Sequence, residues 1–76
     1  MEKQVVYKIT KNEDEAIHIS TGVFKDKSYA DFRIFFRTKE DGEWRPTKKG
    51  ITFEVSHLAE FLKGVQELEK AVSQNA

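Results

Sequence analysis

The sequence contains no cysteine, so the fold cannot rely on a disulfide bond or on thiolate metal ligands. Its histidines, His18 and His57, are isolated and lack the spacing of a metal site, and we expect both to be structural or solvent-facing. A chain of 76 residues buries only about 60% of the surface that its unfolded form exposes, which leaves a small core. Self-association is the remaining way to enlarge that core. We therefore predict a single domain over residues 1–76 that forms a homodimer.

Catalytic motifs are also missing from the sequence. It has no cysteine nucleophile, no Ser-His-acid set on elements expected to be neighbours, and no glycine-rich phosphate loop. No apolar run approaches the roughly 20 residues that span a bilayer, and the N-terminus does not resemble a signal peptide. We expect neither an enzyme nor a membrane protein, and neither a cofactor nor a metal. The expected location is intracellular: the cytoplasm or nucleoid of a bacterium, or the nucleus of a eukaryote.

The net charge is zero, but charges of opposite sign are segregated along the chain. Residues 22–53 hold eight cations and five anions, a net charge of +3, whereas residues 1–21 carry −1 and residues 54–76 carry −2. A basic centre suits a polyanionic partner such as a nucleic acid. Most imbalances of this size, however, belong to solvated faces.

Alternation of apolar and polar residues predicts strands over most of the chain. The strands are expected at residues 5–10, 16–20 and 29–38 and, after a hairpin at Asp41-Gly42, at 43–45 and 51–53. Pro46 is expected to interrupt the last of these, because proline donates no ladder hydrogen bond, and so to mark an edge or a bend.

From about Val55 the apolar period changes to that of a helix, with Ser56 as the expected N-cap. The helix has one apolar stripe, made of Leu58, Phe61, Leu62, Val65, Leu68 and Val72. The predicted fold class is therefore α+β, a whirly-like ββββα arrangement. In it, a four-stranded curved antiparallel sheet within residues 5–53 is followed by one C-terminal helix over 55–73.

Aromatic rings occur on both faces of the long strand. Phe32, Ile34 and Phe36 fall on one face, and Tyr29 and Phe35 fall on the other. Both faces therefore need cover, which a second subunit or a nucleic acid could provide.

Some of these rings suit stacking on bases, which is worth about 1–3 kcal/mol per base and is sequence-tolerant. Core packing is the expected role of Phe32, Phe35 and Phe53. Phe24, in a turn flanked by lysine, and Phe36 are the stacking candidates. For Trp44, packing over the sheet and stacking on bases both remain open.

Asp31 and Arg33 share one face of the long strand, two residues apart. An ion pair is a far more common reason for this spacing than acid–base chemistry. Such a pair could also orient Arg33 toward a phosphate.

The middle and C-terminal part of the sequence resembles the transcriptional positive cofactor 4 family, whose single-stranded-DNA-binding domain has a similar run of residues. The resemblance extends without gaps from about Gly22 to Val72. It is carried by Phe24-Lys25-x-Lys27, by Asp31-Phe32-Arg33 with aromatic residues at 35 and 36, by Gly42-Glu43-x-Arg45-Pro46-x-Lys48-Lys49-Gly50-Ile51, and by a helix with the same apolar phase. The serine-rich region of animal members is absent, so the chain is most similar to the short versions of bacteria and phages.

The resemblance implies a dimer whose two curved sheets form grooves for single-stranded DNA or melted duplex. It implies base stacking by Phe24 and Phe36, and contacts to the nucleic-acid backbone by Lys25, Lys27, Arg33, Arg45, Lys48 and Lys49. It also implies helix and dimer packing by Leu58, Phe61, Val65 and Leu68. Phe36 replaces the tryptophan of animal members, and Gly22 replaces a cation, so weaker stacking and one fewer phosphate contact are expected.

The expected function is sequence-tolerant binding of single-stranded DNA by a homodimer that acts in transcription, replication or repair. Melted duplex and RNA are further expected ligands, and the transcription machinery is a further expected partner. The alternative is a dimeric protein–protein interaction module that does not bind nucleic acid, which the zero net charge favours.

Overall fold

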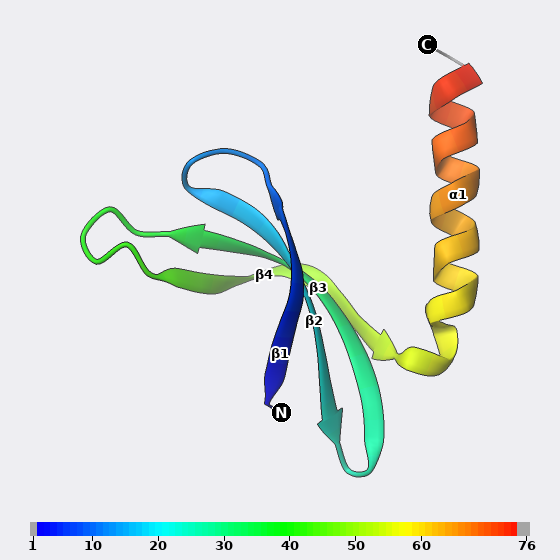
Figure 1. The fold of residues 1–76 in the computed structure, drawn as a ribbon, viewed down its shortest axis with the longest axis horizontal. Coiled ribbons are helices and arrows are strands. Elements are labelled where there is room, and N and C mark those ends of the chain that lie inside the picture. Colours follow the sequence, from blue (N-terminus) through cyan, green and yellow to red (C-terminus); the bar gives the residue numbers. More distant parts are fainter. Residues whose placement is uncertain (1, 75–76) are drawn as a thin grey trace.

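The computed structural model describes residues 2–74 and contains one open antiparallel sheet followed by one helix. The elements are β1 (Lys3–Thr10), β2 (Glu15–Phe24), β3 (Lys27–Arg37), β4 (Trp44–Glu54), a 3₁₀ turn η1 (Val55–His57) and α1 (Leu58–Gln74), and the strands follow the order β1-β2-β3-β4. The sheet is strongly twisted, and α1 rises beside one end of it (Figure 1). The predicted α+β fold class is confirmed. No helix in the described range is long and apolar enough to span a membrane.

The two faces of the sheet differ in chemistry. β2 and β3 pair without interruption from Glu15–Phe36 to Phe24–Lys27, which fixes the side chains that share a face. We call one side the polar face, made of Ala16, His18, Ser20, Asp31, Arg33 and Phe35, and the other the apolar face, made of Ile17, Ile19, Phe32, Ile34 and Phe53.

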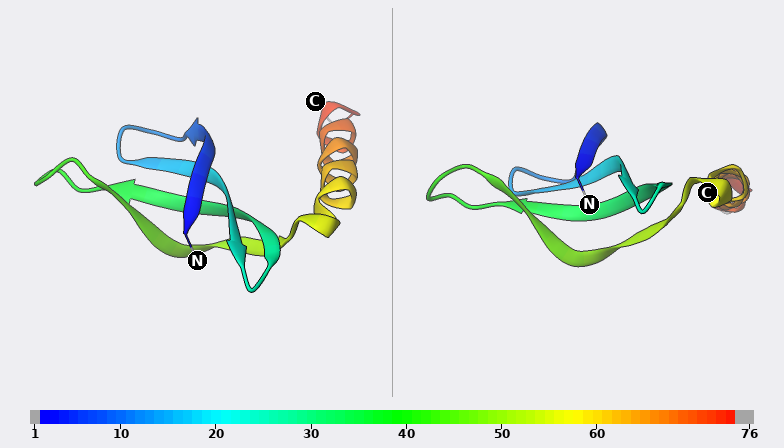
Figure 2. Two further views of the ribbon diagram at one scale, coloured as in Figure 1. Left: turned by 60° about the horizontal axis from the view of Figure 1, so that its bottom comes forward. Right: turned by 90° about the horizontal axis from the view of Figure 1, so that it is seen from below.

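The most buried side chains lie on the polar face. Ala16, His18, Ser20 and Asp31 are each at most 3% exposed, although they belong to only two central strands. The sheet is curved and no helix lies across it (Figure 2). The strands themselves therefore bury these side chains, which requires that the sheet curl around them.

The apolar face carries the aromatic core. The ring centroid of Phe61, from α1, lies 5.0 Å from that of Phe32 and 5.1 Å from that of Phe53, and the two sheet rings are 5.8 Å apart. Aromatic pairs in this range add about 0.5–1.5 kcal/mol each beyond the area that they bury. The core roles predicted for Phe32 and Phe53 are confirmed, and Phe61 anchors the start of the helix to the sheet.

The strands extend further than the sequence pattern predicts. β1 begins at Lys3 rather than at residue 5, and β4 is one strand that contains Pro46 rather than two segments around it. Pro46 is tolerated because β4 is an edge strand, as predicted. Beside it the register shifts, and the Thr47 hydroxyl donates to the Ile34 carbonyl oxygen at 2.7 Å in place of a ladder bond.

The helix begins differently from the prediction. Ser56 is not the N-cap, because Val55–His57 forms a 3₁₀ turn that is preceded by an extended Glu54 with no side-chain cap. The Leu58 N–H donates to the Val55 carbonyl oxygen, which closes the turn without help from a side chain. The α-helix therefore starts at Leu58 rather than at residue 55.

Gly50 of β4 lies directly against the backbone of β3. A Cβ atom at this position would lie 2.7 Å from the Phe32 carbonyl oxygen and 3.0 Å from the Arg33 Cα. Both neighbours are backbone atoms of a central strand, which cannot move without breaking the ladder to β2.

We expect Gly50→Ala to lower the free energy of unfolding by about 1–3 kcal/mol, the usual cost of forcing extra atoms into a packed region. Urea unfolding followed by circular dichroism measures this loss. An unchanged unfolding midpoint would show that β4 can shift away from β3 at little cost.

Candidate nucleic-acid interface

Asp31 is the centre of a hydrogen-bonded network on the polar face. Its side chain is 1% exposed and accepts from Arg33 Nη2 at 3.1 Å and Arg33 Nε at 3.4 Å. Lys3 Nζ lies 3.1 Å from the same carboxylate, and the Thr52 hydroxyl donates to it. The ion pair predicted between Asp31 and Arg33 is confirmed. Burial acts to raise the pKa of Asp31, but the hydrogen bonds from Thr52, Arg33 and Lys3 outweigh it and hold the pKa below 3.8.

Arg33 is committed to contacts within the fold. Besides its bonds to Asp31, its Nη1 donates to the Thr47 carbonyl oxygen at 3.1 Å, and its Nη2 lies 3.3 Å from the Thr52 hydroxyl. A guanidinium has five N–H donors, and these contacts occupy most of them. The observed role of Arg33 is therefore to tie β3 to β4, and its predicted phosphate contact stays a prediction.

The bond from Arg33 to Thr47 fixes a bulge in β4. Between the Gly50–Arg33 and Pro46–Phe35 pairs, residues 47–49 oppose Ile34 alone. The Lys49 N–H donates to the Thr47 hydroxyl at 3.2 Å, which closes the bulge on itself. Lys48 and Lys49 are exposed there, on the outer edge of the sheet. The bulge thus presents two adjacent cations from a backbone that side chains hold in place.

Three of the predicted site residues gather at the β2–β3 turn. Phe24 is 48% exposed, and the Lys25 Nζ lies 5.3 Å from the centre of its ring. Lys27 pairs with Glu54 at 3.1 Å, and this hydrogen bond raises the pKa of the lysine. Lys25 and Asp26 both have positive φ, the geometry of a tight two-residue hairpin.

Phe36 and Arg45 lie at the opposite end of β3. Phe36 is 37% exposed and faces Arg45 across the β3–β4 ladder. Arg45 Nη2 donates to Asp41 at 2.6 Å. The Thr38 hydroxyl, the Glu43 N–H and Arg45 together lower the pKa of Asp41 to about 2. This carboxylate organises the β3–β4 hairpin, a role that the sequence pattern did not indicate.

The two stacking candidates are far apart. Phe24 pairs with Lys27, and Phe36 lies nine positions after Lys27 along β3, which is about 30 Å at the usual strand rise. The register also places the two rings on opposite faces of the pleat. The right-handed twist rotates these faces along the ribbon, so alternation alone does not decide the direction of either ring.

Trp44 packs over the polar face. Its ring centroid lies 5.6 Å from that of His18, and the Arg37 guanidinium carbon is 5.1 Å from its centre. His18 stacks on Phe35 at 4.0 Å, and neither of its ring nitrogens has a hydrogen-bond partner within residues 2–74. Burial, and then the nearby Lys8, lower the pKa of His18, so stacking rather than charge holds the imidazole.

The fold and the surface together define a class of protein. Its members are small open ββββα sheets that expose aromatic rings and cations on their surface. Residues 11–64 match the family model described as Transcriptional Coactivator p15 (PC4), and the chain belongs to this family. Among curated protein sequences, none matches.

Solved structures support the same fold. A PC4 homologue from Burkholderia pseudomallei matches with a TM-score of 0.81 and 24% sequence identity, covering 90% of each chain. The bacteriophage T5 homologue of the eukaryotic transcription coactivator PC4, implicated in recombination-dependent DNA replication, matches with a TM-score of 0.69 and 16% identity. That match covers 95% of this chain and 80% of the phage protein.

We expect the Asp31 network to set the acid stability of the protein. Because the folded-state pKa of Asp31 lies below 3.8, the carboxylate contributes stability above that pH and loses it as pH falls through the folded-state pKa. Asp31→Asn should cost about 3 kcal/mol near neutral pH, since it leaves Arg33 without its buried partner. Urea unfolding at several pH values measures both effects.

The variant should also lose less stability on acidification than the wild-type protein. Glu69→Gln is the matched comparison, because Glu69 is exposed on α1, away from the network, and the variant retains the Asp31 contribution. Parallel pH curves for wild type and Asp31→Asn would contradict the assignment.

Proposed function

We propose that a homodimer of this chain binds single-stranded DNA with little sequence preference, as a binding protein and not as an enzyme. The observation that carries the proposal is the family match over residues 11–64, the stretch that contains every ring and cation assigned to nucleic-acid contact. Melted duplex and RNA are further ligands of the same chemistry.

The proposed mechanism combines stacking with neutralisation of phosphates. Phe24 and Phe36 are exposed at the two ends of β3 and offer ring faces to bases. Lys48 and Lys49 lie between these ends along β4, where they can contact the backbone of a strand that follows the sheet. Such contacts depend on charge and geometry alone, so they do not read sequence.

Two cations in this surface already have exposed carboxylate partners. Lys27 pairs with Glu54 and Arg45 pairs with Asp41, all four with substantial exposure. Exposed ion pairs contribute about 0–1 kcal/mol, so a phosphate can replace the carboxylate at small cost. The pairs orient the cations before nucleic acid arrives.

The exposed apolar stripe of the helix supports the proposal of a dimer. Four residues of the apolar stripe of α1 are 45–63% exposed in the single chain: Leu62, Val65, Leu68 and Val72. Only the start of the helix is anchored to the sheet, through Phe61. A second copy would cover the rest of the stripe with an equally apolar helix, as the family resemblance implies for Leu58, Phe61, Val65 and Leu68.

Transcription, replication and repair all expose single strands, and we place the protein inside the cell, with the nucleic acid. The family name points to transcription, with the transcription machinery as a partner. The T5 relative is implicated in recombination-dependent DNA replication. The exposed stripe also favours a second candidate, a dimeric protein-interaction module without nucleic-acid binding, whose affinity would depend little on salt.

We expect binding of a labelled oligo-dT to weaken with salt at a log–log slope of about −0.7 for each phosphate neutralised. Replacing both Lys48 and Lys49 by alanine should flatten that slope by about 0.7 for each phosphate that the variant no longer neutralises. Fluorescence anisotropy at three salt concentrations measures the slope.

The matched control replaces Lys63 and Lys70 by alanine, which removes the same charge from α1 rather than from the sheet. Its slope should equal that of the wild-type protein. Phe36→Ala should lower the affinity but keep the slope, because a ring releases no counterions. An unchanged slope in the Lys48 and Lys49 variant would exclude these lysines from the interface.

We expect the wild-type protein to have twice the mass of the 8.8 kDa chain in sedimentation equilibrium. Leu68→Glu should shift it toward the monomer, because it places a charge in the centre of the covered stripe. Lys63→Glu puts the same carboxylate on the opposite side of the helix and should leave the mass unchanged. A monomeric wild-type protein would disprove the dimer.

A further inference from the structure

Phe36 lies between two oppositely charged side chains on its own face of the sheet. Glu15 is its direct partner in β2, and Arg45 is its direct partner in β4. Side chains directly opposite each other in an antiparallel pair have their Cβ atoms about 5 Å apart. A base stacked on this ring would therefore have a carboxylate near one edge and a guanidinium near another.

Both flanking side chains are held in place. Asn12 Nδ2 donates to Glu15 Oε1 at 3.2 Å, and Arg45 Nη2 donates to Asp41 Oδ2 at 2.6 Å. Glu15 keeps its second oxygen as an acceptor, and Arg45 keeps its other N–H donors. Neither group needs to leave its present partner in order to bind a base.

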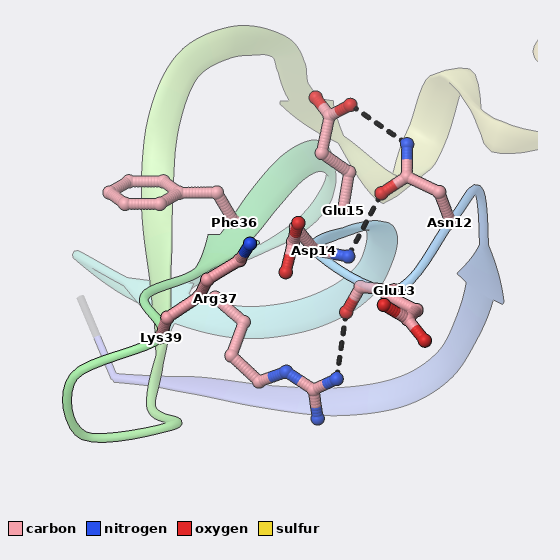
Figure 3. Close-up of a pocket in the computed structure, with 7 residues that line it drawn as sticks. All are labelled: Asn12, Glu13, Asp14, Glu15, Phe36, Arg37 and Lys39. Atoms are coloured by element: carbon pink, nitrogen blue, oxygen red, sulfur yellow. Dashed lines mark hydrogen bonds between the residues drawn. The ribbon is translucent and has the colours of Figure 1, made fainter.

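A hollow of about 630 Å³ lies between the end of β3, at Phe36, and the loop that joins β1 to β2. It is lined on one side by Phe36, Arg37 and Lys39 and on the other by Asn12, Glu13, Asp14 and Glu15, as Figure 3 shows. Pockets of roughly 300–1,000 Å³ accommodate small organic groups, so the space is adequate for a base. It is open to solvent, which suits a base that enters from a flexible strand.

Glu15 cannot serve the sequence-independent part of binding, because a carboxylate repels phosphates. Beside a stacking ring, its second oxygen can accept hydrogen bonds from a base edge. Guanine offers a carboxylate two donors side by side, N1–H and the N2 amino group, and it offers a guanidinium the acceptors O6 and N7. Adenine and cytosine each place a ring acceptor beside their single amino group, and thymine has one N–H between two carbonyls.

Building on the proposed function, we propose that Glu15, with Arg45, gives the base stacked on Phe36 a preference for guanine. The preference acts on one position of an otherwise sequence-tolerant interface. Glu15 is a specificity-determining residue, and Asn12 is the positioning residue that orients its carboxylate.

The test uses thymine oligonucleotides that carry guanine, inosine or adenine at every third position, with affinities measured by fluorescence anisotropy on the intact protein. Inosine lacks only the N2 amino group, and adenine stacks as well as guanine, so stacking strength does not explain a difference. We expect the guanine oligonucleotide to bind about fivefold more tightly than the other two, the lower end for a bidentate contact because the hollow is open to water.

Glu15→Gln should reduce this preference to less than about twofold, because an amide offers a guanine edge only one acceptor oxygen. Glu40→Gln is the matched control: it removes the same charge from the exposed β3–β4 hairpin and should keep the full preference. The comparison of guanine with inosine in the wild-type protein tests the idea even if Glu15→Gln folds poorly.

The outcomes separate the two proposals. Equal, tight binding of all oligonucleotides would overturn the guanine preference and leave single-strand binding intact. A preference that survives Glu15→Gln would also overturn it. Absence of binding to every oligonucleotide, including oligo-dT, would instead overturn the proposed function, and the preference with it.

Discussion

The buried carboxylate of Asp31 is the interaction on which the rest of the sheet depends. It joins Lys3 of β1, Arg33 of β3 and Thr52 of β4 in one network, while its strand pairs with β2 through Ser20. Because no helix lies across this face, the strands bury one another, and the network supplies the attraction that a second layer would otherwise provide (Figure 2). On this face the network links three of the four strands, β1, β3 and β4, through one carboxylate.

The polar face, the apolar face and the ends of the β2–β3 ribbon therefore differ in what their side chains contact. The polar face is occupied by its own network, and through the bond from Arg33 to Thr47 it sets the position of the lysine-bearing bulge. The apolar face packs against Phe61 at the start of the helix, and the rest of the helix stripe is exposed. The two ends of the long β2–β3 ribbon carry the exposed rings of Phe24 and Phe36. A strand of nucleic acid would therefore meet a surface that is already shaped before it binds.

The local pattern of apolar and polar residues predicted most of the fold. Several of the features that it missed depend on hydrogen bonds and ion pairs between residues far apart in the sequence. Alternation and the change of period indicated four strands and a helix, and the spacing of Asp31 and Arg33 predicted their ion pair. Pro46 was expected to break β4, but the Thr47 hydroxyl replaces the missing ladder bond. Ser56 was expected to cap the helix, but a 3₁₀ turn begins it instead.

The candidate site was predictable only as a set of residue types in a family-like order. Their pairings were not: the contacts of Lys3 with Asp31, Lys27 with Glu54 and Arg45 with Asp41 arise from register and hairpin geometry. Sequence spacing likewise gave no sign that Glu15 would lie opposite Phe36. Such pairs can be identified only once the register between neighbouring strands is known.

Competition between single-stranded and duplex DNA distinguishes base stacking from a general attraction for polyanions. Protein bound to a labelled oligo-dT would be titrated with unlabelled single-stranded DNA and, separately, with duplex of the same length at equal nucleotide concentration. We expect the single strand to displace the label and the duplex to do so only at much higher concentration, because paired bases cannot stack on Phe24 and Phe36. Equal displacement by the duplex would contradict base stacking on these rings. It would show that the interface attracts any polyanion.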